Sequence, residues 1–120
     1  MDPISTFFSA WQLSEEDSRV STIKSAVISE VEYNDPRTPE TINNADALCA
    51  YVGMFSANAP GWKAEVVKSD TIGKHTRVTV AFGGMGPDGK QVVQHGQYFV
   101  ELSDNRIIRM TGFVGTGEPT

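Results

Sequence analysis

The hydrophobic pattern of this chain changes its period once, at Pro60-Gly61, and that change limits the folds open to it. Before this dipeptide, apolar residues recur three and four positions apart, which is the spacing of one face of an α-helix. After it, apolar and polar residues alternate in runs separated by Gly, Pro, Asp and Asn, which is typical of antiparallel strands joined by tight turns. Helices in the first half and strands in the second half predict an α+β domain.

One compact domain is the size that this sequence supports. Its 120 residues can bury a single hydrophobic core, so we expect one domain over residues 1–120. Hydrophobic residues make up 39% of the chain and charged residues 21%, which is enough apolar material for a core and too much for a disordered chain. Fifteen acidic and ten basic residues give a net charge of −5. This balance argues against a nucleic acid partner, because phosphate backbones are bound by basic surfaces.

The sequence also argues against metal, nucleotide and membrane proteins. Cys49 is the only cysteine, so no internal disulfide can form, and one thiol with two histidines does not supply a structural zinc site. No glycine-rich phosphate loop such as GxGxxG is present. No apolar run approaches the ~20 residues that cross a bilayer, and the first residues do not resemble a secretion signal. We therefore expect a cytoplasmic protein with no membrane contact, no metal and no organic cofactor.

Two helices are predicted at the start of the chain. Asp2-Pro3 is typical of a helix start, with Asp as the N-cap and Pro at the first helical position. The apolar face of this helix comprises Ile4, Phe7, Phe8 and Trp11. Residues 14–17, Ser-Glu-Glu-Asp, resemble a capping box with a shorter acid, so a second helix is expected to start near Ser14. The two helices are expected to form an αα-hairpin.

A short strand and a third helix follow. The strand is a β-branched run, closed as a turn by Asn34-Asp35-Pro36, and comprises Ile28, Val31 and Tyr33. Asn43 or Asn44 can cap the third helix, which Pro60-Gly61 terminates. The apolar stripe of this helix comprises Leu48, Tyr51, Val52 and Phe55. Cys49 lies beside that stripe and is expected to be an inert buried thiol.

Four strands are predicted after Pro60-Gly61, over residues 63–69, 75–82, 91–102 and 106–114. Gly86-Pro87-Asp88-Gly89 and Ser103-Asp104-Asn105 supply tight turns between long strands. The strands therefore form an antiparallel meander. A long curved meander can pack with the helices lying across its concave side, which gives the domain the shape of a cone.

The order of these elements resembles the nuclear transport factor 2-like superfamily, in its SnoaL-like and steroid Δ-isomerase branch. The resemblance covers nearly the whole chain. It is carried by Asp35-Pro36 after the first strand, and by residues 96–102, Gly-Gln-Tyr-Phe-Val-Glu-Leu, which lead through a tight turn into Arg106-Ile107. It implies a cone-shaped α+β fold with a curved antiparallel sheet and helices packed on its concave face.

Asp35 is the first candidate for a catalytic role. The Asp before the corresponding Pro is the base of steroid isomerases, so the resemblance implies that Asp35 shuttles a proton between carbons of a ligand. A carboxylate at the mouth of an apolar cone loses hydration and becomes a better base than a solvated one; ketosteroid isomerase itself is a worked case of this logic. The alternative is that Asp35 only starts a turn, its side chain accepting hydrogen bonds from nearby backbone amides.

Tyr98 is the second candidate. Isomerases of this family use a Tyr on the first helix and a protonated Asp on the third long strand as oxyanion donors, and this chain departs from both. Phe7, Phe8 and Trp11 carry no phenol, and the acidic position, two residues after Gly96, aligns with Tyr98. A phenol can donate to a developing enolate, so Tyr98 can replace the missing donor. The alternative is a strand Tyr that packs across the sheet.

Other polar side chains are weaker candidates. Strand alternation prevents His95 and Tyr98 from both entering the pocket unless Gly96 forms a bulge, and we expect His95 on the outer face. His75 is expected at a solvated strand edge. Arg106 and Arg109 could orient an anionic ligand, although the Arg-x-Asp pair of limonene-type epoxide hydrolases is absent.

The sequence thus predicts a pocket for a small, largely apolar ligand. Its walls are expected to comprise Trp11, Met54, Phe82, Met110 and Val114, each of which could instead be plain core. One hypothesis is a cofactor-independent isomerase or polyketide cyclase-like enzyme, with Asp35 as the base. The other is a non-catalytic module that binds a ligand or a protein partner through the same cone, since this fold hosts both.

A homodimer is the expected assembly, since relatives often pair through the outer face of the sheet. The face expected to pair comprises Gln97, Phe99, Arg109, Thr111 and Phe113.

Overall fold

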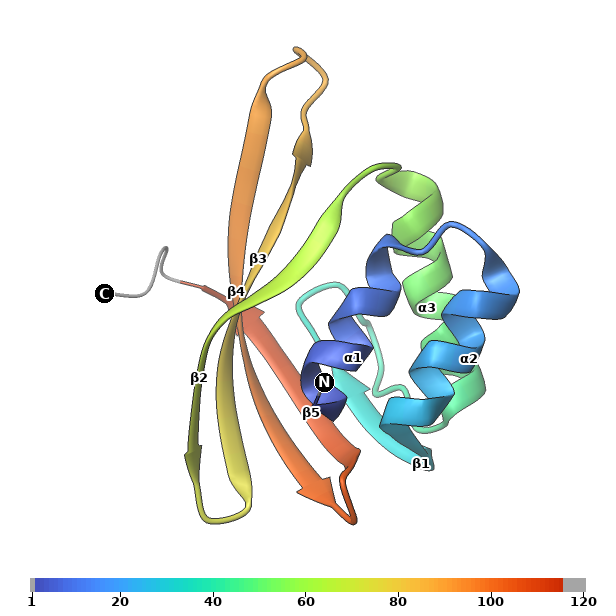
Figure 1. Cartoon of the computed structure of the whole chain (residues 1–120), viewed down its shortest axis with the longest axis vertical. Helices are drawn as coiled ribbons and strands as arrows, with labels where there is room; N and C mark the ends of the chain where they lie inside the picture. Colours follow the sequence, from blue (N-terminus) through green and yellow to red (C-terminus); the bar gives the residue numbers. More distant parts are fainter. Residues whose placement is uncertain (1, 116–120) are drawn as a thin grey trace.

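A computed structural model describes residues 2–115 of the chain. The elements run in the order α1 (Pro3–Ser9), a 3-10 turn η1 (Ala10–Gln12), α2 (Glu16–Ala26), β1 (Val27–Asn34), α3 (Ala45–Asn58), β2 (Lys63–Ile72), β3 (His75–Met85), β4 (Gln91–Ser103) and β5 (Arg106–Val114). Figure 1 shows the helices gathered on one side of a strongly curved sheet. The predicted α+β layout, with helices before Pro60 and a sheet after it, is confirmed.

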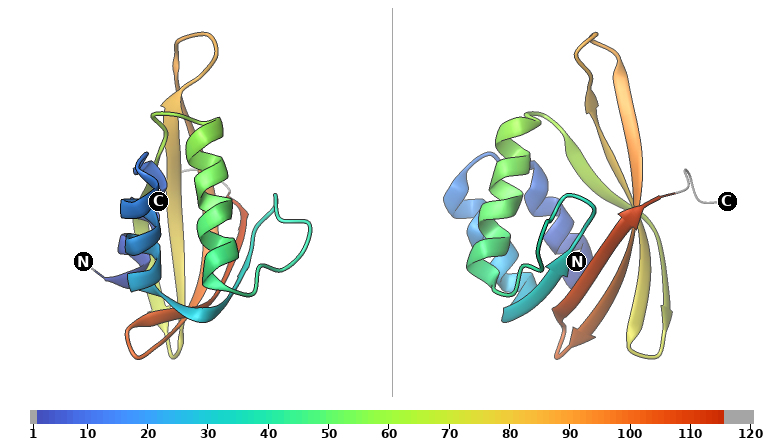
Figure 2. Two further views of the ribbon diagram at one scale, coloured as in Figure 1. Left: turned by 90° about the vertical axis from the view of Figure 1, so that its right-hand side faces the viewer. Right: turned by 180° about the vertical axis from the view of Figure 1, so that it is seen from behind.

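The sheet contains all five strands, in the order β1-β5-β4-β3-β2. The last four strands pair antiparallel with their neighbours, as the sequence predicts for a meander. β1 pairs parallel with β5 at the edge of the sheet, with Tyr33 opposite Met110. The alternation within β1 predicts a strand but does not name its partner, so this parallel edge is a feature that the structure adds. It places the end of β1, and the loop that follows it, beside the concave face (Figure 2).

Helix capping follows the sequence at two of three positions. The Asp2 carboxylate accepts a hydrogen bond of 2.9 Å from the Ser5 amide, and the Asn44 side chain accepts one of 2.7 Å from the Ala47 amide. The capping box expected at Ser14 does not form. The N-cap of α2 is Glu15, which makes no side-chain capping hydrogen bond, and the Arg19 guanidinium donates to the Leu13 carbonyl, 3.1 Å away.

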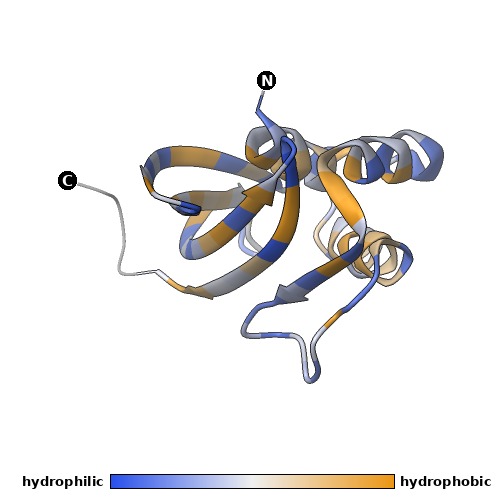
Figure 3. Cartoon of the chain, turned by 90° about the horizontal axis from the view of Figure 1, so that it is seen from below, coloured by the Kyte–Doolittle hydropathy of each residue, from blue (hydrophilic) through white to orange (hydrophobic). Residues whose placement is uncertain are grey.

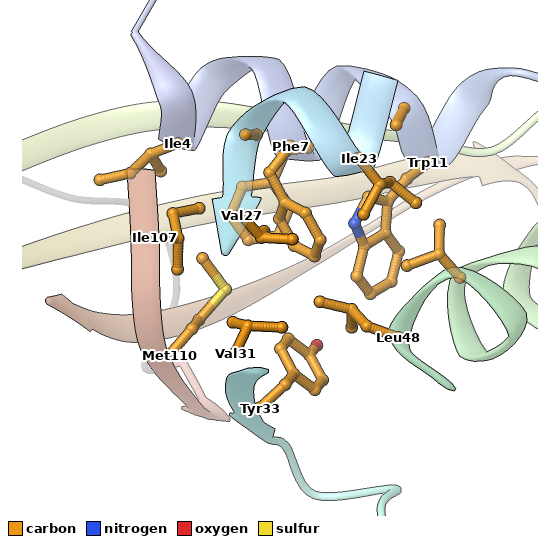
Figure 4. Packing of buried hydrophobic residues seen from close by; sticks show 14 of the residues in the cluster. Ile4, Phe7, Trp11, Ile23, Val27, Val31, Tyr33, Leu48, Ile107 and Met110 are labelled. Carbon is orange, nitrogen blue, oxygen red and sulfur yellow. The ribbon is translucent and has the colours of Figure 1, made fainter. Parts of the chain in front are cut away.

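The core lies between the concave face of the sheet and the three helices. Figure 3 shows apolar and polar residues alternating along the strands, so that one face of the sheet is apolar. Figure 4 shows the buried side chains that meet it, with Phe7 and Trp11 from the first helical segment, Ile23 from α2 and Leu48 from α3. Cys49 is also buried, as predicted, and burial raises the pKa of its thiol.

The outer face of the sheet carries an exposed aromatic pair. The side chains of Phe99 and Phe113 are 43% and 54% exposed, and their ring centroids lie 5.8 Å apart in an edge-to-face arrangement. Arg109 on the same face bonds to Glu32 and Glu101, so charged residues border the aromatic pair. No helix among residues 2–115 is long and apolar enough to span a membrane.

We expect this face to pair with a second copy of the chain. Phe99→Ser should then shift the equilibrium toward monomer, because it removes apolar area from the centre of the interface. Sedimentation velocity at micromolar concentration measures the change, and Ile72→Ser, at an exposed apolar residue at the end of β2, is the matched control. A native chain that sediments only as a monomer would contradict the expectation.

Candidate functional site

A cavity of about 460 Å³ opens between α3, the loop after β1 and the concave face of the sheet. This volume lies in the range of about 300–1,000 Å³ that is usual for small-molecule sites. Its wall is rich in aromatic residues, which are Trp11, Tyr51, Phe55, Trp62, Phe82, Tyr98 and Phe113. Asp35 and Arg37 line the cavity from the loop, and Gln94 lines it from β4. The cavity is therefore an apolar pocket with a small set of polar groups.

Asp35 is fixed by a turn in the way that its sequence context suggests. One carboxylate oxygen, Oδ1, accepts hydrogen bonds from the backbone amides of Arg37 and Thr38, at 2.8 and 3.1 Å. The Thr38 hydroxyl lies 3.0 Å from the Asp35 amide. These bonds are those of an Asx turn, and they orient the carboxylate so that its other oxygen, Oδ2, is directed away from the turn.

Two phenols meet at Oδ2 of Asp35. Tyr33 from β1 and Tyr51 from α3 donate to this atom, at 2.7 and 2.5 Å. The hydroxyl of Tyr98 on β4 lies 3.4 Å from the hydroxyl of Tyr33. The chain contains three tyrosines, and all of them belong to this network. The Asp35 carboxylate therefore has a role beyond the turn, because it accepts hydrogen bonds from two other elements of the fold.

The phenols of this network remain protonated over a wide pH range. Burial raises the pKa of Tyr33, Tyr51 and Tyr98 above the ordinary value of 10.0. For Tyr51, the hydrogen bond to Asp35 raises the pKa further, because the phenolate would lose that bond. At neutral pH each of these hydroxyls is a hydrogen-bond donor.

Glycines on the sheet make room for Tyr98. Gly112 pairs with Tyr98 across β4 and β5, and a Cβ atom at Gly112 would lie 2.4 Å from the Tyr98 ring. The ring therefore lies directly over the backbone of β5. Gly96 has a similar role, since a Cβ there would lie 3.2 Å from Phe82 and 3.3 Å from Tyr98. A side chain at either position would push aromatic rings into the cavity.

Five of the seven residues proposed from the sequence line this cavity. They are Asp35, Tyr98, Trp11, Phe82 and Val114. The assignment of Met54 to the wall is wrong: its side chain is 63% exposed, on the face of α3 that points away from the sheet. Met110 is also not a wall residue, because it is 1% exposed and packs beside Ile107 and Val31 in the closed part of the core (Figure 4).

Sequence reasoning missed other residues of the site. Tyr51 and Phe55 lie one turn apart on the stripe of α3 that was predicted to face the core, so their position was available from the spacing. The position of Trp62 could not be predicted from helical or strand spacing, because it lies in the connection between α3 and β2. Its ring packs over Gly84, and its indole nitrogen donates to the Met85 carbonyl, 3.2 Å away.

The charged candidates fall at different places. His95, which was expected on the outer face, lines the cavity together with Tyr98, and its backbone carbonyl accepts a hydrogen bond from the Gly115 amide at 2.8 Å. Arg106 and Arg109 do not line the cavity, and the guanidinium of Arg109 is bound to two glutamates on the outer face. His75 is exposed at the start of β3. Within residues 2–115, no three His, Cys, Asp or Glu side chains form a group suited to a metal ion.

The contact between Gly112 and Tyr98 gives a test of this geometry. Gly112→Ala should lower the free energy of unfolding by about 1–3 kcal/mol, because the ring has to move to admit the methyl group. Urea unfolding measures the loss. The control is Gly83→Ala on β3, where the new Cβ would meet its nearest atom at 3.4 Å, an ordinary contact. Equal stability changes in the two variants would show that Tyr98 does not lie over Gly112.

The tyrosine network predicts a pH dependence. As pH rises through about 10, unfolded chains release their phenol protons and the folded chain retains them, so stability should fall with pH above that value. The absorbance of phenolate measures the titration directly. We expect none of the three tyrosines of the folded chain to ionise near pH 10, and all three to do so in denaturant. A tyrosine that titrates near pH 10 in the folded chain would contradict the network.

Comparison with known proteins identifies the fold. No family model matches the sequence, and a search of curated proteins found no match. Solved structures do match. A proposed isomerase of the SnoaL-like family from Agrobacterium tumefaciens superposes with a TM-score of 0.79 at 23% identity, over 94% of each chain.

Two further solved structures are similar. A proposed SnoaL-like polyketide cyclase from Jannaschia sp. gives a TM-score of 0.75 at 13% identity, over 92% of this chain and 81% of that one. A proposed ketosteroid isomerase from Kribbella flavida gives 0.69 at 18% identity, over 98% of this chain and 78% of that one. The chain therefore has the nuclear transport factor 2-like fold, in the form that SnoaL-like proteins share.

Proposed function

We propose that this protein binds a small, largely apolar carbonyl compound and moves a proton at the carbon next to the carbonyl. Asp35 is the base, Tyr98 donates a hydrogen bond to the carbonyl oxygen, and no metal or organic cofactor takes part. The solved structures with this fold include proteins described as isomerases and as a polyketide cyclase, which supports this class of reaction. We also propose that the protein acts in the cytoplasm, the compartment that the sequence favours for a chain without a cysteine pair.

The observation that carries the proposal is the convergence of two groups on one aromatic cavity. Asp35 reaches it from the loop after β1, and Tyr98 reaches it from the sheet. Their hydroxyl and carboxylate groups are linked through the Tyr33 hydroxyl, 2.7 Å from Asp35 and 3.4 Å from Tyr98. A carbonyl oxygen near Tyr98 would place the neighbouring carbon on the side of the cavity where Asp35 lies.

The proton transfer can be written so that every atom is accounted for. Oδ2 of Asp35 takes a proton from the carbon next to the carbonyl, and the electrons of the broken C–H bond form the double bond of an enolate. The negative charge moves to the carbonyl oxygen, which accepts a hydrogen bond from Tyr98. Where a carbon–carbon double bond adjoins the carbon that lost the proton, the negative charge extends over that bond as a dienolate. Return of the proton to the far end of that bond moves the double bond and completes an isomerisation.

The network lets Oδ2 act as a base although two phenols donate to it. When the carboxylate takes a proton, the Tyr33 hydroxyl has a second acceptor, because the Tyr98 oxygen lies 3.4 Å away. Tyr98 is then free to donate into the cavity.

Asp35→Asn tests the proposed base. The amide keeps the shape of the carboxylate but cannot accept a proton, so exchange of the α-protons of 2-tetralone, a flat two-ring ketone, should fall to the rate without protein. Proton NMR in deuterated water measures the exchange, and the affinity for the ketone should change little. Asp17→Asn, at an exposed carboxylate in the first turn of α2, is the control and should exchange at the native rate.

The second candidate function is a binding module without catalysis. It is favoured by the four donors around Asp35, two backbone amides and two phenols, which occupy both carboxylate oxygens. In that case Asp35 positions the loop and the phenols, and the cavity only holds its ligand. Ketone exchange that is the same in the native chain and in the Asp35→Asn variant would overturn the proposed reaction and leave this second candidate.

A further inference from the structure

Among residues 2–115, the cavity has one cation without a protein partner, Arg37, and one carboxylate whose oxygens both accept hydrogen bonds from the protein, Asp35. Trp62 uses its indole nitrogen on the Met85 carbonyl. The polar side chains that remain are those of Tyr98, Gln94, His95 and Arg37. Of these, the Arg37 guanidinium carries five donors and no acceptor. A ligand that satisfies Arg37 has to bring an acceptor.

Arg37 is the cation at the mouth of this cavity. Its backbone amide donates to Asp35, so the turn that orients the carboxylate also fixes where the Arg37 side chain leaves the loop. The side chain is exposed and lines the cavity. Among residues 2–115, no carboxylate lies within ion-pair distance of its guanidinium, and the guanidinium makes no hydrogen bond.

Four other cations of the described chain have protein partners. Arg77 is paired with Asp70, Arg109 with Glu32 and Glu101, and Lys24 with Asp46. The guanidinium of Arg19 is buried and donates to the Leu13 carbonyl. Among residues 2–115, the other unpaired cations do not line this cavity, and they are Lys63, Lys68, Lys74, Lys90 and Arg106. Arg37 is thus distinguished by two properties together: its charge has no protein partner among the described residues, and it lies on the wall of an apolar cavity.

The charge of Arg37 reaches the phenols inside the cavity. Burial raises the pKa of Tyr51 and of Tyr98, and the positive charge of Arg37 acts on both in the opposite direction. The guanidinium is therefore close enough to influence a negative charge that forms beside either hydroxyl. The negative charge of Asp35 acts on the two phenols in the opposite direction to Arg37. Four hydrogen bonds from the protein stabilise the Asp35 carboxylate.

We infer that the ligand of this cavity is an apolar molecule that carries one anionic group, such as a carboxylate, and that Arg37 binds this group at the mouth. The inference rests on the proposed function only in placing the ligand in the same cavity, and it names the class of ligand. A planar guanidinium is suited to a carboxylate because two of its N–H groups can bond to both oxygens. The apolar body of the ligand then lies against the aromatic wall.

Two probes that differ by one charge test the inference. 1-Anilinonaphthalene-8-sulfonate is anionic, and N-phenyl-1-naphthylamine has the same rings without the sulfonate. The chain contains two tryptophans, Trp11 and Trp62, and both line the cavity. Energy transfer from tryptophan to the probe therefore reports a bound probe, and titration gives a dissociation constant for each. The effect of the Arg37 variants identifies the part of this binding that lies at the cavity.

Arg37→Gln should weaken binding of the anionic probe about fivefold, which is the effect of an exposed ion pair worth about 1 kcal/mol. Binding of the neutral probe should change less than about twofold. Arg37→Lys should retain part of the preference, and added salt should reduce it in the native chain. Arg106→Gln, at an exposed arginine that does not line this cavity, should leave both constants unchanged.

Three outcomes would overturn the inference: equal binding of the two probes to the native chain, an equal effect of Arg37→Gln on both, or no energy transfer from either. These outcomes differ from failure of the proposed function. Loss of the charge preference in Arg37→Gln, together with ketone exchange that does not depend on Asp35, would retain the anionic ligand and reject the reaction.

Discussion

The Asp35 carboxylate is the interaction on which the rest of the site depends. Its two oxygens have different partners. One accepts hydrogen bonds from backbone amides and shapes the loop after β1, and the other accepts hydrogen bonds from the hydroxyls of Tyr33 and Tyr51. A single residue thus joins the loop, the edge strand β1 and the helix α3. Charged acceptors make stronger hydrogen bonds than neutral ones, so this junction is held more firmly than its small size suggests.

Packing around this junction explains why the cavity stays open. Large aromatic rings cannot collapse as aliphatic chains do, and those of Trp11, Phe55 and Phe82 contact one another edge to face or tilted. On the sheet side, Gly96 and Gly112 have no side chains, so the rings of Tyr98 and Phe82 can lie close to the backbone of the strands. The depth of the pocket therefore comes from missing side chains on the strands as much as from the helices above them.

The elements of the fold could be predicted from the sequence because their signals are local. Asp2-Pro3 and Asn44 mark helix starts, and the alternation after Pro60-Gly61 marks the strands. The parallel pairing of β1 with β5 is not a local property, since the two strands are separated by a helix and three other strands. The burial of single residues was harder to predict than the periodicity of the elements. Met54 and Met110 both suit an apolar wall, but Met54 lies on the exposed side of its helix and Met110 lies in the closed core.

The candidate site could be predicted only in part, because some of its features are local in the sequence and others are not. A turn sequence can place Asp35 at the end of a strand, and strand alternation can place Tyr98 on the concave face of the sheet. Neither rule reveals that Tyr33 and Tyr51 meet the same carboxylate oxygen, because that contact joins residues from β1 and α3 whose relative position is set by the whole core. Arg37 is a similar case, because only the finished cavity shows which exposed cation lies on its wall.

The parallel edge formed by β1 and β5 also bears on how the chain folds. Tyr33 pairs in register with Met110, so β1 has no partner strand in the sheet until β5, which follows α3 and three other strands, has been synthesised. Contacts of such high sequence separation form late, since the intervening chain must first be ordered. The three phenols and the carboxylate come together only when that closure is complete, so partly made chains would hold the residues of the site without the site itself.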